Sequence, residues 1–233
     1  MKLYKLTDKD GCTHGGTKWG PGVQNEARDP GKGPLCGPGW IHAYEHPLLA
    51  VLHDPIHGEF LTRQDVRLCP IHGEFLARQD ARLWECETDD QEPLRDGQMK
   101  IGVRSLTTIR EIPIPRITLE QRARYAIPCA KLVYSEPKWV AWVDSWLDGS
   151  DRTSAAAWAA EAWASAREAR TWATAAMAAA TAVEEARMVE GAARGTARVA
   201  KTWAAARAAE VANECSPEVD LISIAEEAMK EER

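Results

Sequence analysis

The sequence predicts an α+β protein in which a small amino-terminal α+β domain, residues 1–116, precedes an α-helical domain, residues 117–233. Short runs that alternate polar and apolar residues between glycine- and proline-rich segments predict strands in the first half. A long alanine-rich run without proline predicts helices in the second half. A chain of 233 residues has room for two such domains.

The amino-terminal domain is predicted to begin with a strand over residues 2–7, where polar and apolar residues alternate. Glycine and proline are dense over residues 11–39, so we expect a long loop there without regular elements. An extended pattern resumes at residues 40–44. A short helix over residues 47–52 should follow, with Pro47 in its first turn.

Two further strands are predicted at residues 82–87 and 105–112. The second should stop at Ile112, because Pro113 and Pro115 lack the backbone donor that a strand ladder needs. Between the helix and these strands, residues 55–69 and 70–84 agree at twelve of fifteen positions, which is a tandem duplication over 55–84. We expect it to be an insertion that lengthens a loop, because loop length costs little free energy.

The helical domain should open with two capped helices. Thr118 and Gln121 have capping-box spacing, which predicts a helix over residues 119–134. A second helix should begin at Ser135, carry Pro137 in its first turn and end at Gly149. Its apolar stripe is predicted to be core: Trp139, Trp142, Val143 and Trp146.

The alanine-rich run covers residues 153–214, where 27 of 62 residues are alanine. Two glycines at residues 191–195 predict a break that folds the run into a helical hairpin. Large aromatic side chains lie on more than one side of this run, so we expect either packing anchors or a partner-binding or self-association surface at four tryptophans: Trp158, Trp163, Trp172 and Trp203. A final helix, capped by Ser216, should present one apolar face.

Charge argues against several classes of partner. The alanine-rich run has seven basic and seven acidic residues, and the whole chain has a net charge of −6, so we expect no nucleic-acid partner. Charged residues interrupt every stretch of membrane-spanning length, so we expect no membrane partner.

The first residues lack the apolar core of a signal peptide, and the six cysteines show no CxxC spacing. These features predict a cytoplasmic protein with free thiols.

Three motifs together resemble a group of uncharacterised proteins of bacteria and their phages: Trp19-Gly20-Pro21-Gly22, the run from Leu35 to Ala43, and the run from Leu106 to Ile112. Members of that group have a small amino-terminal domain with a Cys-Gly-x-Gly motif followed closely by histidine, and many carry an alanine-rich helical tail. The resemblance implies a phage-host setting and brings no known activity with it.

The favoured hypothesis is an interaction or assembly protein that forms a homo-oligomer or binds a protein partner. The alternative is a nucleotide-handling enzyme, because the glycine-rich loop before His42 resembles ADP-ribosyltransferase-like folds. That resemblance implies that His42 holds a ribose and that Glu85 or Glu87 positions a nucleophile. The candidate ligand pocket comprises Cys36, Gly37, Gly39, His42 and Tyr44.

Four histidines have a spacing that could suit zinc: His42, His46, His53 and His57. Pro47 and Pro55 follow two of them closely and disturb a shared helical face, so we predict no metal ion. We also predict no cofactor and assign no catalytic residue. Whether the protein is an enzyme stays open.

Overall fold

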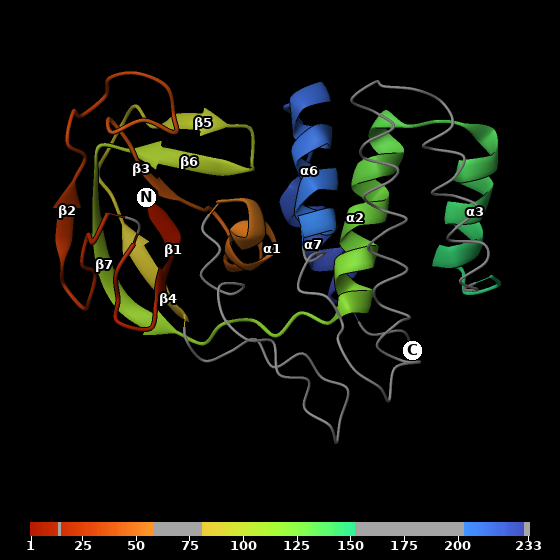
Figure 1. Ribbon diagram of the computed structural model, residues 1–233, viewed down its shortest axis with the longest axis horizontal. Helices are drawn as coiled ribbons and strands as arrows, with labels where there is room; N and C mark the ends of the chain where they lie inside the picture. Colours follow the sequence, from red (N-terminus) through yellow and green to blue (C-terminus); the bar gives the residue numbers. More distant parts are fainter. Residues whose placement is uncertain (14, 58–80, 152–202, 231–233) are drawn as a thin grey trace. The chain divides into compact units, whose positions relative to one another are not determined.

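The computed structural model describes residues 1–13, 15–57, 81–151 and 203–230, and its α+β class confirms the predicted fold class (Figure 1). The described residues form two compact units. The first unit contains those up to residue 116 together with 217–222, and the second contains the remainder. The described strands all belong to the first unit.

Four antiparallel strands in the order β1-β4-β7-β2 form the larger sheet of the first unit (Figure 1). Strands β1 and β4 pair along their whole length, with Lys2 opposite Glu87 at one end and Asp8 opposite Ala81 at the other. Strand β7 lies next to β4 in the sheet. It ends at Ile112 as predicted, directly before the first of the prolines. The bounds of the strands are β1 Lys2–Asp8, β2 Gln24–Glu26, β4 Ala81–Glu87 and β7 Ser105–Ile112.

A second sheet has the order β3-β6-β5, with bounds β3 Ile41–Ala43, β5 Leu94–Asp96 and β6 Lys100–Val103. Two backbone hydrogen bonds join this sheet to the first. The amide of Tyr4 donates to the carbonyl of Tyr44, the amide of Tyr44 donates to the carbonyl of Tyr4, and both distances are 2.8 Å. Helix α1, Pro47–His57, follows β3 and packs against β1. The junction of the two sheets therefore lies beside α1.

The core of the first unit gathers apolar side chains from both sheets: Leu3, Trp19, Ala43, Trp84, Cys86, Ile101, Val103 and Leu106. Trp84 is one of its two tryptophans and is fully buried. Its indole Nε1 donates to the hydroxyl of Thr7 at 3.0 Å, so its polar atom is satisfied inside the core. The core thus fixes β1 against β4.

The strands predicted at residues 2–7, 40–44, 82–87 and 105–112 are confirmed as β1, β3, β4 and β7. The expectation of an entirely irregular segment over residues 11–39 is wrong, because β2 lies within it. Helix α1 continues to His57, beyond the predicted end at residue 52. Strands β5 and β6 were not predicted. Residues 58–80, which include most of the duplication, lie outside the described part of the chain.

The second unit contains three complete helices: α2 Leu119–Val133, α3 Pro137–Leu147 and α6 Trp203–Cys215. The predicted capping box is confirmed, since the amide of Gln121 donates to Thr118 Oγ1 at 3.1 Å and the amide of Thr118 donates to Gln121 Oε1 at 2.9 Å. Helix α3 is capped by Glu136 rather than by Ser135. The carboxylate of Glu136 reaches the amide of Trp139 at 2.9 Å and so satisfies a donor of the first turn.

The end of α6 also differs from the prediction. The amide of Ser216 donates to the carbonyl of Ala212 at 2.8 Å, so Ser216 completes α6. The last helix, α7 Leu221–Ala228, begins five residues after Ser216, and the predicted cap is therefore wrong. Its apolar face is nevertheless buried at Leu221, Ala225 and Ala228.

Helix α6 shows how the alanine-rich sequence packs. It lies against α2, and its buried side chains are mostly alanine: Ala205, Ala206, Ala208, Ala209, Val211, Ala212 and Asn213. The remaining side of the helix is more exposed and carries Arg207, Glu210 and Glu214. A helix of small residues allows close approach of several neighbours, as the composition suggests. Among the described residues, no helix is both long enough and apolar enough to cross a membrane.

Candidate functional site: a cavity in the amino-terminal unit

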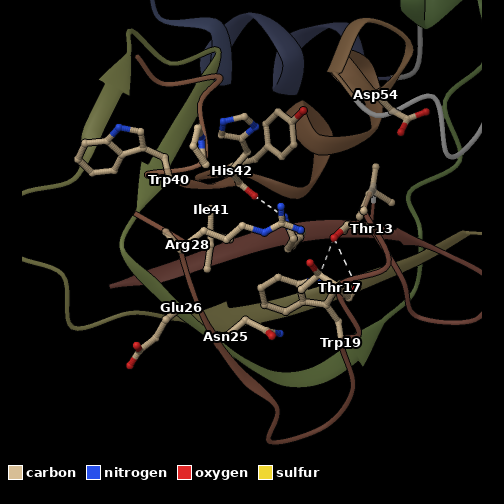
Figure 2. Close-up of a pocket in the computed structure, with 16 residues that line it drawn as sticks. Thr13, Thr17, Trp19, Asn25, Glu26, Arg28, Trp40, Ile41, His42 and Asp54 are labelled. Carbon is tan, nitrogen blue, oxygen red and sulfur yellow. Dashed lines mark hydrogen bonds between the residues drawn. The ribbon is translucent and has the colours of Figure 1, made fainter. Parts of the chain in front are cut away.

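A cavity of about 500 Å³ lies in the amino-terminal unit (Figure 2). Its lining comes from β1, from β2 and the loops on either side of it, from β3 and from α1. Buried lining residues such as Lys5 and Trp19 form its floor, whereas Gly15, Glu26 and Arg28 are exposed and mark its opening. The volume falls in the range of small-molecule sites, about 300–1,000 Å³.

Aromatic rings form much of the wall. Trp19 is 3% exposed, and its Nε1 donates to Thr13 Oγ1 at 3.1 Å. Trp40 is held by the preceding loop, because its Nε1 donates to the carbonyl of Gly33 at 3.1 Å. Figure 2 shows the two indoles on different sides of the cavity. Since both N–H groups are bonded to the protein, the rings present apolar surface to a ligand.

Lys5 is the charged group of the floor. It follows Leu3 and precedes Thr7 on the inward face of β1, and it is only 8% exposed. Its Nζ donates to the carbonyl of His42 at 2.7 Å and lies 5.0 Å from the centre of the Trp19 ring. Burial lowers the pKa of Lys5 to about 8, because desolvation disfavours the ammonium. No carboxylate pairs with Lys5 within the described part of the chain.

Arg28 supplies a second positive charge at the opening. Across the described residues, its guanidinium has no hydrogen-bond acceptor and no ion-pair partner. Figure 2 shows the Arg28 side chain extending toward the centre of the cavity, whereas the carboxylate of Glu26 points away from it. Five donors in a planar fork are therefore available to a ligand at this end.

His42 is held in one tautomer by the loop before β3. Its Nε2 contacts the carbonyl oxygen of Leu35, and a carbonyl can only accept, so the proton sits on Nε2. Burial lowers the pKa of His42, and the charges of Lys5 and Lys100 lower it further. The imidazole is thus neutral near pH 7, with Nδ1 as its remaining acceptor.

Two of the predicted pocket residues, His42 and Tyr44, line the cavity, and three do not. Cys36 is exposed, and its Sγ accepts a hydrogen bond from Lys100 Nζ at 3.1 Å. A Cβ on Gly37 would lie 2.9 Å from the carbonyl of Pro34, and one on Gly39 would overlap the carbonyl of Lys32. These two glycines therefore allow the chain to fold closely on itself before β3.

The glutamates assigned to the ADP-ribosyltransferase-like alternative do not line the cavity. Glu85 pairs with Lys2 at 2.8 Å and with Arg110 at 3.0 Å, and these partners lower the pKa of its carboxyl group. The acidic residues that do line the cavity are Glu26, whose carboxylate points away from it, and Asp54. The structure therefore places His42 in the cavity without Glu85 or Glu87.

The residues that sequence reasoning missed are Lys5, Trp19, Arg28 and Asn25. The sequence does contain a signal for Lys5. A lysine that lies between two inward-facing positions of a buried strand needs polar groups around it. Trp19 belongs to the Trp-Gly-Pro-Gly motif, which was not assigned to the site. Arg28 and Asn25 lie in the segment expected to be an irregular loop. No alternation of polar and apolar residues there indicates which side chains point inward.

The histidines do not gather into a metal-ligand cluster: among the described residues, no group of three or more His, Cys, Asp or Glu side chains converges. His53 is fully buried in α1, and its Nδ1 lies 3.2 Å from the carbonyl oxygen of Met99. Burial lowers the pKa of His53 to about 4. His53 therefore remains neutral and structural at physiological pH.

The predicted partner surface falls largely outside the described residues. The described part of the chain does not include Trp158, Trp163, Trp172 or the predicted break at residues 191–195. Trp203 begins α6, and only its backbone is described. The self-association hypothesis thus stays a prediction.

Comparison with known proteins leaves the cavity as the basis for assigning a function. The chain matches no protein-family model, and neither a curated protein nor a solved structure is similar to it.

Proposed function

We propose that the amino-terminal unit binds a small anionic molecule with a planar ring, of the nucleotide class. One observation carries this proposal: the same cavity combines the Trp19 and Trp40 indoles with two cations, Lys5 and Arg28, that have no carboxylate partner among the described residues. Aromatic walls suit a base, and unpaired cations suit a phosphate.

The aromatic part of the ligand would contact the indole surfaces. Both indole N–H groups are already occupied by Thr13 and Gly33, so the rings contribute by stacking and apolar burial. Base-aromatic stacking contributes about 1–3 kcal/mol per base. Since every base has such a face, this contact selects for planarity more than for one particular base.

The anionic part of the ligand would be placed by Arg28. A guanidinium can donate two parallel hydrogen bonds to a phosphate or carboxylate, and Arg28 has no competing acceptor within the described residues. Its exposed position lets a highly charged phosphate keep part of its hydration. The neutral His42 ring offers Nδ1 as an acceptor for a hydroxyl or amino group deeper in the cavity.

Titration calorimetry with AMP, ADP, ATP and NAD tests this proposal. We expect binding by at least one of them and a loss of affinity of about 10-fold or more in Arg28→Met, because a hydrogen bond to a charged group contributes about 1.5–3 kcal/mol. Arg110→Met is the matched control, since Arg110 is exposed on β7 and does not line the cavity. Absence of binding by all four, or equal affinity in wild type and Arg28→Met, would contradict the proposal.

A second proposal concerns assembly: the alanine-rich residues 153–214 mediate self-association or bind a protein partner. The burial of the alanines of α6 supports it, because α6 is the described end of this run and shows that such sequence packs closely against a neighbouring helix. The free thiols of the described cysteines support the further proposal of a cytoplasmic protein.

Sedimentation equilibrium at micromolar concentration tests self-association. We expect a mass above that of the 25.7 kDa chain, and we expect Trp163→Glu to shift the protein toward monomer without loss of helicity. A charge placed in an apolar interface is costly, which gives the direction of the shift. A single species at the monomer mass for the wild type would exclude a homo-oligomer.

A further inference from the structure

We propose that the Lys5 amine forms a reversible imine with the aldehyde or ketone group of a ligand bound in the cavity. The inference uses the cavity of the proposed function but does not depend on whether nucleotides bind there. It gives Lys5 a covalent role in addition to its positive charge, whereas the proposed function places the anion mainly at Arg28.

Geometry makes Lys5 the candidate. Its side chain is more than nine-tenths buried and lines the cavity floor, so a ligand that fills the cavity reaches Nζ. The only hydrogen-bond acceptor that the described residues offer to Nζ is the carbonyl oxygen of His42, at 2.7 Å. A single acceptor leaves the other positions on nitrogen open to an incoming group.

The surroundings favour a neutral amine. Buried lysines are normally paired with carboxylates, which hold the proton on nitrogen, and Lys5 lacks such a pair within the described chain. The Trp19 ring at 5.0 Å offers the ammonium a weaker interaction. Removal from water therefore dominates and lowers the pKa of Lys5 from 10.5 to about 8. At neutral pH this increases the fraction of neutral amine by roughly two orders of magnitude relative to an exposed lysine.

Other charged groups around Lys5 act in both directions. Cys86 on β4 raises the pKa of Lys5 when its thiol ionises, but burial keeps the pKa of that thiol at about 12. Asp54 of α1 and Glu26 line the same cavity and favour the ammonium, whereas Arg28 disfavours it. His42 is neutral and contributes no charge near pH 7.

The chemical step is balanced without an oxidant or reductant. The lone pair of Nζ attacks the carbonyl carbon, a C–N bond forms, and the electron pair of the C=O π bond moves to oxygen. A proton passes from nitrogen to that oxygen to give a carbinolamine. Loss of one water then forms the C=N bond, and addition of water reverses the sequence. Nitrogen must be neutral for the attack, which is why desolvation of Lys5 matters.

The features of the cavity define the class of ligand: a carbonyl compound that also carries an anionic group and a flat ring. The carbonyl would meet Lys5 at the floor, the ring would contact Trp19 or Trp40, and the anion would reach Arg28 at the opening. Pyridoxal 5′-phosphate has all three features and serves as the probe. Propionaldehyde has only the carbonyl and serves as the comparison.

The experiment treats the wild-type full chain with a substoichiometric amount of each probe, then with borohydride, which reduces an imine to a stable amine. Peptide mass mapping locates the adduct. We expect pyridoxal 5′-phosphate to label Lys5 at least 10-fold faster than any exposed lysine, with Lys2 as the internal reference on the same strand. Propionaldehyde should show the same site with a smaller preference. Labelling of Lys5 should rise as pH increases through about 8, since the neutral amine becomes the main form.

Two variants complete the test. Lys5→Arg should lose the adduct and keep the remaining labelling, and Lys2→Arg should label Lys5 like the wild type. Labelling spread over exposed lysines with Lys5 unmodified in the wild type would overturn the proposal, whatever the variants do. Nucleotide titration of the same samples keeps the two proposals separate: binding without a Lys5 adduct leaves the proposed function standing and removes this inference, and an adduct without nucleotide binding does the reverse.

Discussion

Replacement of Trp84 by alanine is expected to lower the free energy of unfolding of the amino-terminal unit by about 3–5 kcal/mol. The ring is fully buried between β1 and the rest of the core, and Arg82 covers one of its faces at 4.4 Å. Truncation would also leave the Thr7 hydroxyl without its indole donor, 3.0 Å away. Domains of this size have only about 5–15 kcal/mol of stability, so the variant would retain little of it.

Denaturant unfolding measures this loss, with Trp40→Ala as the matched control. Trp40 is the same residue type in the same unit, but it is only partly buried and its Nε1 bonds to a loop carbonyl. We expect Trp40→Ala to cost less than half as much as Trp84→Ala. Equal losses for the two variants would mean that the core around Trp84 is not the main support of the unit.

Sequence reasoning succeeded where a local pattern and the tertiary surroundings agree. In β1, Leu3, Lys5 and Thr7 lie on one face, and the strand pairs with β4 over its whole length. The capping box at Thr118 is a purely local interaction, so spacing alone was sufficient to predict it. Both features depend on residues that are close in sequence or on a clear period of two.

Strands β2, β5 and β6 were missed because their pairing is decided at long range. Asn25 of β2 lies opposite Leu106, about eighty residues away, and the strand has no apolar alternation of its own. Gly102 in β6 lies opposite His42, and glycine is depleted in strands generally. A Cβ at Gly102 would lie 3.0 Å from Cβ of Trp40, so a close approach explains that glycine.

The candidate site was only partly predictable for the same reason. His42 and Tyr44 were found because they follow a glycine-rich run, His42 on β3 and Tyr44 directly after this strand. Lys5, Trp19 and Arg28 come from three other segments, and only the folded sheets bring them to the same cavity. The starts of α3 and α7 show a smaller form of this difficulty, since several residues near each helix end could serve as the cap and packing selects among them.

In the helical unit, Trp142→Ala is expected to lower the free energy of unfolding by about 3–5 kcal/mol, whereas Trp142→Phe should cost less than about 1.5 kcal/mol. The Trp142 ring is 5% exposed and lies 6.1 Å from the Trp139 ring, so its removal leaves a large cavity. Its Nε1 is buried, and none of the described residues accepts a hydrogen bond from it. Phenylalanine keeps most of the apolar volume and removes this unsatisfied donor, so the gain offsets part of the lost packing.

The measurement is the midpoint of denaturant unfolding at constant slope, followed by helical circular dichroism. Leu147→Ala is the control on the same helix, because Leu147 is 38% exposed and should cost no more than about 1 kcal/mol. If Trp142→Phe destabilised the unit as much as Trp142→Ala, the indole N–H would have to make a stabilising contact that phenylalanine cannot replace. If both variants cost less than about 1 kcal/mol, the ring would lie at the surface, because burial of an indole cannot be lost so cheaply.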